Sequence, residues 1–128
     1  MRSLVLGVLG LLLAACQPKA SDACTVIRAL SVEEGFRAGY TNSPDVTIKK
    51  GGCIEFVNED PSGTIHLAQS KPTTPEELKF NTPNLLPNPE YKAKVVFNIA
   101  GEIEYICGLN TGTVVHARTM YGKITVLP

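Results

Sequence analysis

Histidine and methionine are scarce in this sequence, with two of each among 128 residues, and the four cysteines include no Cys-x-x-Cys pair. A structural zinc site of the common kind is therefore a poor fit. Acidic and basic residues balance at 12 each and no Lys/Arg run stands out, so charge gives no reason to expect a nucleic-acid partner. The length suits one domain, and no internal repeat or heptad pattern is visible.

The N-terminus carries an apolar run over Leu4–Leu13, preceded by Arg2. A run of about ten residues is too short to span a bilayer, which needs about 20, and is typical of a signal peptide. The run ends in Leu13-Ala14-Ala15-Cys16, which resembles a bacterial lipoprotein cleavage box. This resemblance predicts an exported protein, periplasmic or at the cell surface, held to a membrane by a lipid on Cys16. The alternative is a plain signal peptide that leaves Cys16 as a spare thiol.

These signals divide the chain into a signal peptide over residues 1–15, a tether over 16–23 and one folded domain over 24–128. The domain shows the periodicity of strands, with short β-branched runs bounded by turn residues. We expect an all-β fold, a Greek-key antiparallel β-sandwich of seven to eight strands. The expected strands cover residues 25–30, 46–49, 53–57, 64–69, 92–97, 102–107 and 122–127.

The segment Lys71–Glu90 is different, because it contains five of the nine prolines. Proline cannot donate to a strand ladder, so a central strand is excluded there. We interpret the segment as a long ordered crossing between two sheets. Thr74-Pro75-Glu76-Glu77 predicts one helical turn within it, with Thr74 as the cap.

The stretch from Tyr105 to Val126 carries the chemistry. It offers Cys107 at a strand end, then His116 and Met120. Two imidazoles and one thiolate suit a trigonal copper ion, and a distant thioether completes such a site. The second imidazole must then come from His66, the only other histidine in the chain.

Three blocks of sequence resemble the plastocyanin/azurin family, the cupredoxins. They are Val46–Asn58, Gly101–Cys107 and Met120–Val126, the last of which matches a Met-x-Gly-x-x-x-Val ending. The resemblance implies one type 1 copper ion bound by His66, Cys107 and His116, with Met120 as axial ligand. It also implies electron transfer without bond-making chemistry, so that the chain is not expected to be an enzyme.

The sequence departs from the family in three places. Eight residues separate Cys107 from His116, where the family commonly has two to four. Leu67 follows the first histidine, where many members have an Asn that braces the ligand loop, and Gly108 follows the cysteine, where a hydroxyl residue is frequent. Because hydrogen bonds around a metal site orient its ligands and tune its potential, these departures bear on the colour and potential of the site.

The resemblance also implies a disulfide between Cys24 and Cys53, which would tie the first strand to its neighbour as in azurin. Export makes a disulfide plausible. The alternative is a pair of buried free thiols.

We therefore expect a monomer that shuttles single electrons between redox proteins, such as cytochromes or membrane oxidoreductases. In the family, an apolar rim surrounds the exposed edge of the C-terminal histidine, and the residues at 109, 114, 115 and 117 are candidates for it; the alternative is that they only pack the longer loop. Glu76, Glu77, Glu102 and Glu104 are candidates for an acidic docking patch, although a solvated face is favoured.

Three rival functions can be weighed against this expectation. A periplasmic copper carrier would hold copper without a redox role, but such proteins favour clusters of Met and His, and the mature chain keeps only Met120. A copper enzyme would need a further copper site, and no histidine is left to build one. A metal-free adhesive sandwich would show no strong visible absorption with Cu(II).

Overall fold

The structure is a computed structural model and describes residues 23–128. The predicted signal peptide of residues 1–15, the predicted lipid attachment at Cys16 and residues 17–22 of the predicted tether lie outside the described residues. Within the described part, no helix is both long and apolar enough to cross a membrane.

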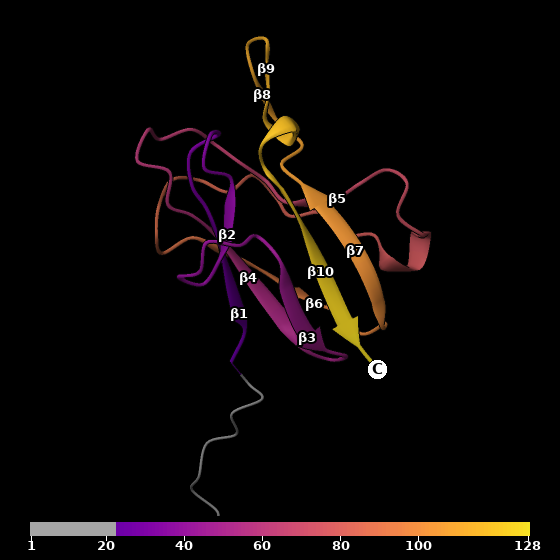
Figure 1. The fold of residues 1–128 in the computed structure, drawn as a ribbon. Coiled ribbons are helices and arrows are strands. Elements are labelled where there is room, and N and C mark those ends of the chain that lie inside the picture. The colour runs from indigo at the N-terminus through magenta and orange to yellow at the C-terminus, as the bar shows by residue number, and fades with distance from the viewer. Residues whose placement is uncertain (1–22) are drawn as a thin grey trace, which may run out of the picture.

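Ten strands and two short 3-10 helices make up the described residues (Figure 1). In chain order they are β1 (Thr25–Ala29), β2 (Phe36–Ala38), β3 (Val46–Lys49), β4 (Cys53–Asn58), β5 (Gln69–Ser70), η2 (Glu76–Leu78), β6 (Lys92–Val96), β7 (Gly101–Ile106), β8 (Asn110–Thr111), β9 (Val114–Val115), η3 (His116–Arg118) and β10 (Tyr121–Leu127).

The strands form two four-stranded sheets and one small hairpin. The first sheet has the order β2-β1-β4-β6, the second has the order β3-β10-β7-β5, and β8 pairs with β9. The all-β sandwich expected from the sequence is confirmed, but both sheets are mixed. Strands β1 and β4 run parallel, as do β10 and β3, so the expectation of a purely antiparallel sandwich is wrong.

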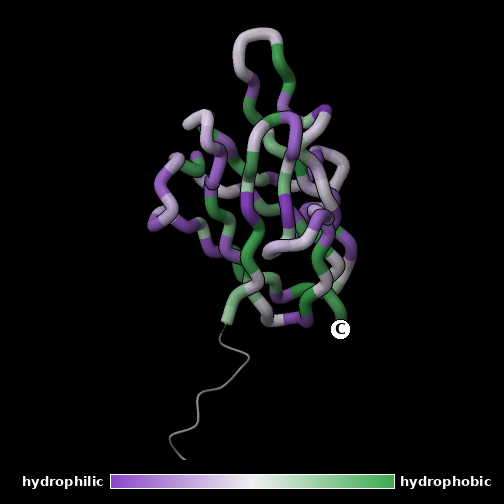
Figure 2. The backbone as a smooth tube through the Cα atoms, turned by 60° about the vertical axis from the view of Figure 1, so that its left-hand side comes forward, coloured by the Kyte–Doolittle hydropathy of each residue, from purple (hydrophilic) through white to green (hydrophobic). Residues whose placement is uncertain are grey.

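The core lies between the two sheets and follows from the alternation of the strands. In β3, Val46 and Ile48 are buried whereas Thr47 and Lys49 are exposed, as a strand with one inward face requires. The tube in Figure 2 shows hydrophobic and hydrophilic residues interspersed along the strands. Burying one large apolar side chain contributes roughly 1.5–3 kcal/mol, so this alternation fixes the face that each strand turns inward.

Aromatic contacts join the two sheets at the centre of the core. The ring of Tyr105, on β7, lies 5.0 Å from that of Phe36 and 6.1 Å from that of Phe56, and these two belong to the opposite sheet. The Tyr105 hydroxyl donates to the carbonyl of Pro44 at 2.5 Å, which satisfies the only polar group of the side chain.

The prediction of a strand over residues 64–69 is largely wrong. Only Gln69–Ser70 forms a strand there, and His66 makes a single bridge to Leu85, whose N–H donates to the His66 carbonyl at 2.6 Å. Leu85 lies between Pro83 and Pro87, which have no N–H with which to extend the pairing. His66 therefore stands on a loop that pairs with residues 81–85 through isolated bonds rather than through a continuous ladder.

The proline-rich crossing contains the predicted helical turn, as the 3-10 helix η2. The helix begins after Pro75, which occupies the cap position, and no side chain caps it. The predicted role of Thr74 as cap is therefore wrong. Strand β2 and the hairpin strands β8 and β9 were not predicted from the sequence.

The disulfide implied by the family resemblance is present between Cys24 and Cys53. Cys24 immediately precedes β1 and Cys53 begins β4, and these strands pair in parallel with Thr25 opposite Ile54. The disulfide therefore ties the start of the folded domain, just before β1, to the neighbouring strand β4.

Two adjacent strands of the second sheet bring the candidate ligands of the C-terminal region together. Strand β7 ends at Ile106 and β10 begins at Tyr121, and these residues pair with each other. Just beyond the pair, the N–H of Cys107 donates to the carbonyl of Met120 at 3.0 Å. The sheet thus places residues 107 and 120 side by side at the end of the sandwich where the β8–β9 hairpin projects (Figure 1).

Candidate metal centre

Cys107 is fully buried at the end of β7 and is the one cysteine without a disulfide partner among the described residues. Its Sγ lies 3.8 Å from Nδ1 of His66 and 3.5 Å from Nδ1 of His116. One ligand atom from each of the three side chains lies within 4.8 Å of the others. The structure therefore brings together the three side chains singled out by the sequence.

The loop that carries His66 is braced by an amide from another strand. Asn58, at the end of β4, is buried, and its Nδ2 donates to the carbonyls of Thr64 and Leu85, each at 2.8 Å. These bonds fix the chain on both sides of the His66–Leu85 bridge. Asn58 therefore braces this loop from β4, and the backbone N–H of Leu67 forms a hydrogen bond to the Cys107 sulfur.

The far nitrogen of the His66 ring is held by a carboxylate. Nε2 lies 2.8 Å from Oδ2 of Asp60, and both side chains are almost fully buried. An ionised carboxylate can only accept, so Nε2–H donates to Asp60 and the lone pair of the neutral ring stands on Nδ1, the nitrogen nearer Cys107. This is the tautomer that a metal on Nδ1 requires.

The long connection between Cys107 and His116 folds as the hairpin β8–β9. Its turn contains Gly112, whose φ of 58° lies in the left-handed region that favours glycine. The N–H of His116 donates to the carbonyl of Leu109 at 3.2 Å, which closes the hairpin and returns the histidine to the site. Nε2 of His116 lies 2.7 Å from Oγ1 of Thr111, on the hairpin itself. The extra residues thus form a regular element and position the second imidazole.

Met120 is fully buried beside these residues. Its N–H donates to the carbonyl of His116 at 2.8 Å, and its own carbonyl accepts from the Cys107 N–H. A glycine elsewhere permits this arrangement: Gly35 has a φ of 78°, and a Cβ there would come within 2.8 Å of the Thr119 carbonyl. Met120 is thus held by its backbone next to two of the clustered residues, which makes it the candidate for a fourth ligand.

The ionisable groups of the metal-free site are tuned by burial. Burial raises the pKa of the Cys107 thiol, although hydrogen bonds from the N–H groups of Leu67 and Leu109 partly counteract this. Burial also lowers the pKa of His116, and the neighbouring His66 lowers it further, against the opposing charge of Asp60. A thiol and a neutral imidazole are the ground state of such a pocket, and a bound cation would displace the thiol proton.

The expectation that His116 presents an exposed edge is wrong. The side chain is completely buried, and Thr111 of the β8–β9 hairpin occupies the hydrogen-bonding position at Nε2. Among the predicted rim residues, Leu109 packs against the core, whereas Val114 is half exposed on the hairpin.

Two residues of the site were missed in the sequence. Asp60 lies in a stretch that resembles a turn, and Thr111 lies in a Gly/Thr-rich loop, so each had a sufficient local explanation. A carboxylate six residues before a candidate ligand was the one available signal for Asp60. No signal in the sequence identified Thr111, because its position depends on the hairpin register.

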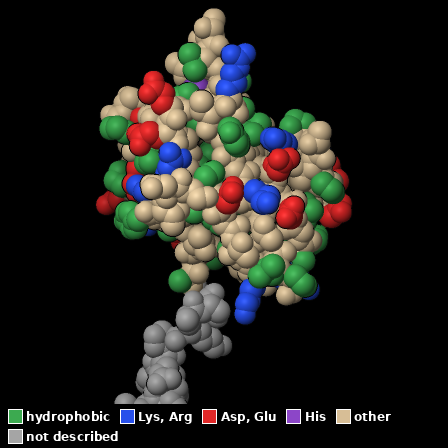
Figure 3. All heavy atoms as spheres, viewed as in Figure 1, with side chains coloured by type: hydrophobic (Ala, Val, Ile, Leu, Met, Phe, Trp, Pro, Cys, Tyr) green, Lys and Arg blue, Asp and Glu red, His purple; other side chains and the backbone are tan. Residues whose placement is uncertain are grey.

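The acidic residues considered as a docking patch lie in a mixed face. Three of these carboxylates face lysines: Glu104 lies 3.6 Å from Lys71, Glu102 lies 3.8 Å from Lys123, and Glu76 lies 3.1 Å from Lys79. Figure 3 shows acidic and basic side chains interspersed on the visible face. This arrangement favours the solvated face over an acidic patch.

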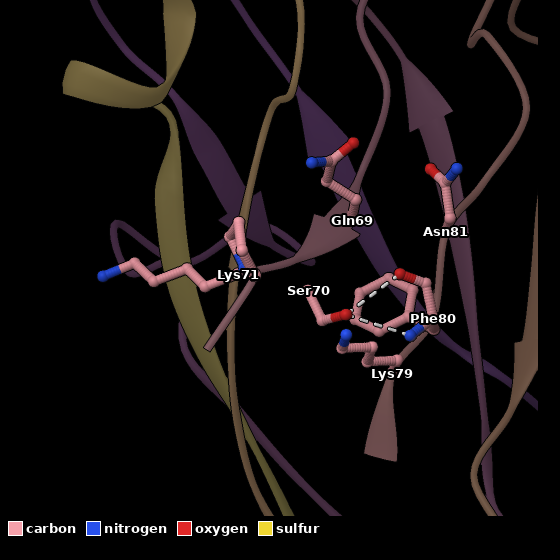
Figure 4. Close-up of a pocket in the computed structure, with 7 residues that line it drawn as sticks. Gln69, Ser70, Lys71, Lys79, Phe80 and Asn81 are labelled. Carbon is pink, nitrogen blue, oxygen red and sulfur yellow. Dashed lines mark hydrogen bonds between the residues drawn. The ribbon is translucent and has the colours of Figure 1, made fainter. Parts of the chain in front are cut away.

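A surface pocket of about 430 Å³ lies next to β5, lined by Gln69, Ser70, Lys71, Pro72, Lys79, Phe80 and Asn81 (Figure 4). Ser70 closes one side of it, since its hydroxyl donates to the Phe80 carbonyl at 3.2 Å and accepts from the Phe80 N–H at 3.1 Å. None of the clustered ligand candidates lines this pocket, so it is separate from the metal centre.

Comparison with protein families and with curated proteins finds no family model and no curated protein that matches the chain. Solved structures do match. An oxidised Met-to-Leu variant of amicyanin superposes with a TM-score of 0.58 at 18% identity, over 88% of each chain. A reduced Pro-to-Phe variant of amicyanin gives a TM-score of 0.57 at 19% identity, over 84% of this chain and 86% of the other.

The chain has the cupredoxin fold. A Met-to-Ala variant of amicyanin in its Cu(I) form, with a TM-score of 0.57 and 17% identity over 88% of each chain, belongs to the same group of neighbours. Within a cupredoxin fold, a cysteine sulfur at the end of β7 and two imidazoles turned toward it form a donor set that suits copper, because sulfur and imidazole together accommodate both of its oxidation states.

Proposed function

We propose that the chain is an electron carrier that holds one type 1 copper ion. Nδ1 of His66, Sγ of Cys107 and Nδ1 of His116 would hold the ion, and the thioether of Met120 would be a fourth, weaker ligand. The observation that carries the proposal is the convergence of one sulfur and two ring nitrogens, from three separate stretches of chain, inside a fully buried pocket. A bound copper ion would take one electron from a donor protein, passing from Cu(II) to Cu(I), and give it to an acceptor.

The residues around the site keep the ligands in place. Both imidazoles are hydrogen-bonded at Nε2, to Asp60 and to Thr111, so neither ring is free to turn away. The Cys107 sulfur accepts hydrogen bonds from the backbone N–H groups of Leu67 and Leu109. A frame of this kind suits both oxidation states with little movement, which lowers the cost of reorganisation in each transfer.

In this proposal the electron does not pass through a solvent-exposed edge of the His116 ring. His116 is buried and its Nε2 contacts Thr111, which is itself an exposed residue on the hairpin. In this proposal the electron enters or leaves through the His116–Thr111 contact, and a redox partner docks against the β8–β9 hairpin.

The burial of the ligands disfavours the alternative of a copper carrier. A carrier passes its ion directly to an acceptor, and this requires that the acceptor's ligands reach the metal. His66, Cys107 and His116 are all inaccessible to solvent. A second copper site, as a copper enzyme would need, has no histidine available, because the sequence has two and both belong to this cluster.

The proposal extends to the setting of the protein. It is a monomer that is exported, periplasmic or at the cell surface, and anchored to a membrane by a lipid on Cys16. Its donors and acceptors are redox proteins such as cytochromes or membrane oxidoreductases. The disulfide between Cys24 and Cys53 supports export, since disulfides persist in oxidising compartments.

The deciding experiment adds Cu(II) to the domain of residues 24–128 and records visible absorption and EPR spectra. We expect one equivalent of copper to produce an intense thiolate-to-copper band, and Cys107→Ser to abolish it while far-UV circular dichroism stays unchanged. A coloured site that survives Cys107→Ser would contradict the proposal. Retention of copper through repeated reduction and oxidation with a chelator present separates the shuttle from the carrier, which would lose its ion.

A further inference from the structure

Asp60 is the one buried carboxylate in contact with a clustered ligand. It is 5% exposed, and its side chain faces that of His66, which is fully buried. Contact between a histidine and a carboxylate is the arrangement that fixes ring orientation and strengthens ligands in many metal sites. The contact between Asp60 and His66 therefore suggests that Asp60 has a role in the site.

The carboxylate is itself held at both oxygens. Oδ2 accepts from Nε2–H of His66 at 2.8 Å, while Oδ1 accepts from the N–H of Ser62 at 2.8 Å and from its hydroxyl at 2.7 Å. Asp60 also donates its own N–H to Oδ1 of the buried Asn58 at 2.9 Å. The group is therefore rigid. Each oxygen of the side chain faces hydrogen-bond donors, which is the environment of a carboxylate that only accepts.

The two imidazoles of the site are held differently. The oxygen at Nε2 of His66 belongs to a carboxylate with a full negative charge, whereas the oxygen at Nε2 of His116 belongs to the neutral hydroxyl of Thr111. No lysine or arginine contact to Asp60 occurs among the described residues, so its charge acts on the His66 side of the pocket uncompensated by an ion pair with either.

We propose that Asp60 is a positioning residue that fixes His66 in the tautomer with Nδ1 unprotonated and, through its charge, favours the higher oxidation state of a metal bound there. The first part concerns the metal-free protein. The second rests on the proposed function, because a negative charge stabilises Cu(II) more than Cu(I) in a medium of low dielectric constant.

The tautomer is measured without any metal. Nitrogen-15 NMR of the reduced, metal-free domain at about pH 8, where imidazoles in proteins are generally neutral, resolves two rings, because the chain has two histidines. We expect His66 to carry its proton on Nε2 in the wild type. Asp60→Asn should shift this ring toward a mixture of tautomers. A wild-type His66 with its proton on Nδ1 would overturn the proposal, whatever the variant does and whether or not the protein binds copper.

The charge effect is measured on the copper-loaded protein by voltammetry, with a neighbour as control. Asp60→Asn and Glu59→Gln remove the same charge from adjacent positions, but Glu59 is partly exposed and bonds Arg28 at 3.2 Å. We expect Asp60→Asn to lower the preference for Cu(II) over Cu(I) about tenfold, which raises the potential by about 59 mV for one electron, and Glu59→Gln to change it much less. Equal shifts in the two variants would refute a local role.

A third variant tests the same idea in the other direction and keeps the carboxylate. Ser62→Ala removes the hydroxyl that donates to Oδ1, which leaves more negative charge available to His66. We expect a lower potential and an unchanged Nε2–H tautomer. A potential that rises in both Ser62→Ala and Asp60→Asn would show that the loop merely loosens when it is altered, and the proposal would fail. A protein that takes no copper but shows the expected tautomer would instead refute the proposed function alone.

Discussion

The hydroxyl oxygen of Thr111 lies 2.7 Å from Nε2 of His116, although the two residues are separated by the turn of a hairpin. This contact explains how a connection of eight residues can still return a histidine to Cys107. The hairpin returns the chain to the site and supplies the hydrogen-bond partner of the buried ring. Figures 1 and 2 both show the hairpin standing out from the body of the sandwich.

Thr111→Val keeps the shape of the side chain but removes this partner. A buried N–H without an acceptor costs about 1–3 kcal/mol, so we expect the free energy of unfolding to fall by about that amount. The affinity for Cu(II) should fall roughly tenfold, because His116 loses its orientation. Urea unfolding and competition with a chelator measure the two effects. Thr113→Val, at the exposed turn, is the control and should change neither quantity.

Met120→Leu tests the axial position. The two side chains have similar volume, so the substitution should cost less than about 1.5 kcal/mol of stability. If the thioether is a ligand, its loss removes a donor that favours Cu(II), and the reduction potential rises while the thiolate band remains. Voltammetry of both proteins measures the shift. An unchanged potential would mean that Met120 serves only the core.

Tyr105 predicts how stability depends on alkaline pH. Burial raises the pKa of its hydroxyl far above the ordinary 10.0, with a contribution from Asp45. A raised pKa in the folded state means that the stability contributed by the neutral phenol is fully present below pH 10.0 and is lost as the pH rises beyond it.

Unfolding in urea at about pH 8 and about pH 11 measures this dependence. Tyr105→Phe should lose about 1 kcal/mol or more at the lower pH, through the missing bond to Pro44, and should show a smaller further loss at the higher pH than the wild type. Tyr121→Phe, at a side chain that is half exposed, should behave like the wild type. A loss at high pH as large in Tyr105→Phe as in the wild type would contradict the assignment.

Removal of the disulfide should weaken the fold but leave the metal centre intact. The bond spans 29 positions, and a closed loop of about that length is worth roughly 3–4 kcal/mol in the chain-entropy model. The double variant Cys24→Ser, Cys53→Ser should lose about that much free energy of unfolding. Its thiolate-to-copper band should persist, because Cys53 begins β4 whereas the Asn58 brace ends it. Loss of the band in a folded double variant would contradict this separation.

The sequence was most informative for side chains that can be recognised by their order along the chain and by their position at the end of a predicted strand. Cys107, His116 and Met120 follow one another around β7 and β10, both of which were predicted as strands from the sequence. The His66 cluster could be predicted for a simpler reason, since the chain offers no other histidine. The disulfide followed from the resemblance rather than from the residues themselves.

The residues beyond the ligands could not be predicted, because their roles depend on tertiary register. In the sequence, Asp60 has the features of an ordinary turn residue. Only the folded loop shows that its carboxylate faces His66. Thr111 is a loop residue until Asn110 and Thr111 pair with Val114 and Val115. The burial of His116 follows from that hairpin, so the expectation of an exposed edge failed for the same reason.

The position of β10 between β3 and β7 has a consequence for biosynthesis. A nascent chain can assemble the whole first sheet from residues up to 96, but β3 and β7 have no contact in the ladder until residues 121–127 arrive between them. The second sheet is therefore completed only when β10, the last of the described strands, takes its place between β3 and β7. Under the proposed function, the ligand set that includes Met120 is complete only once β10 has paired with β7, which places the Met120 carbonyl against the Cys107 N–H.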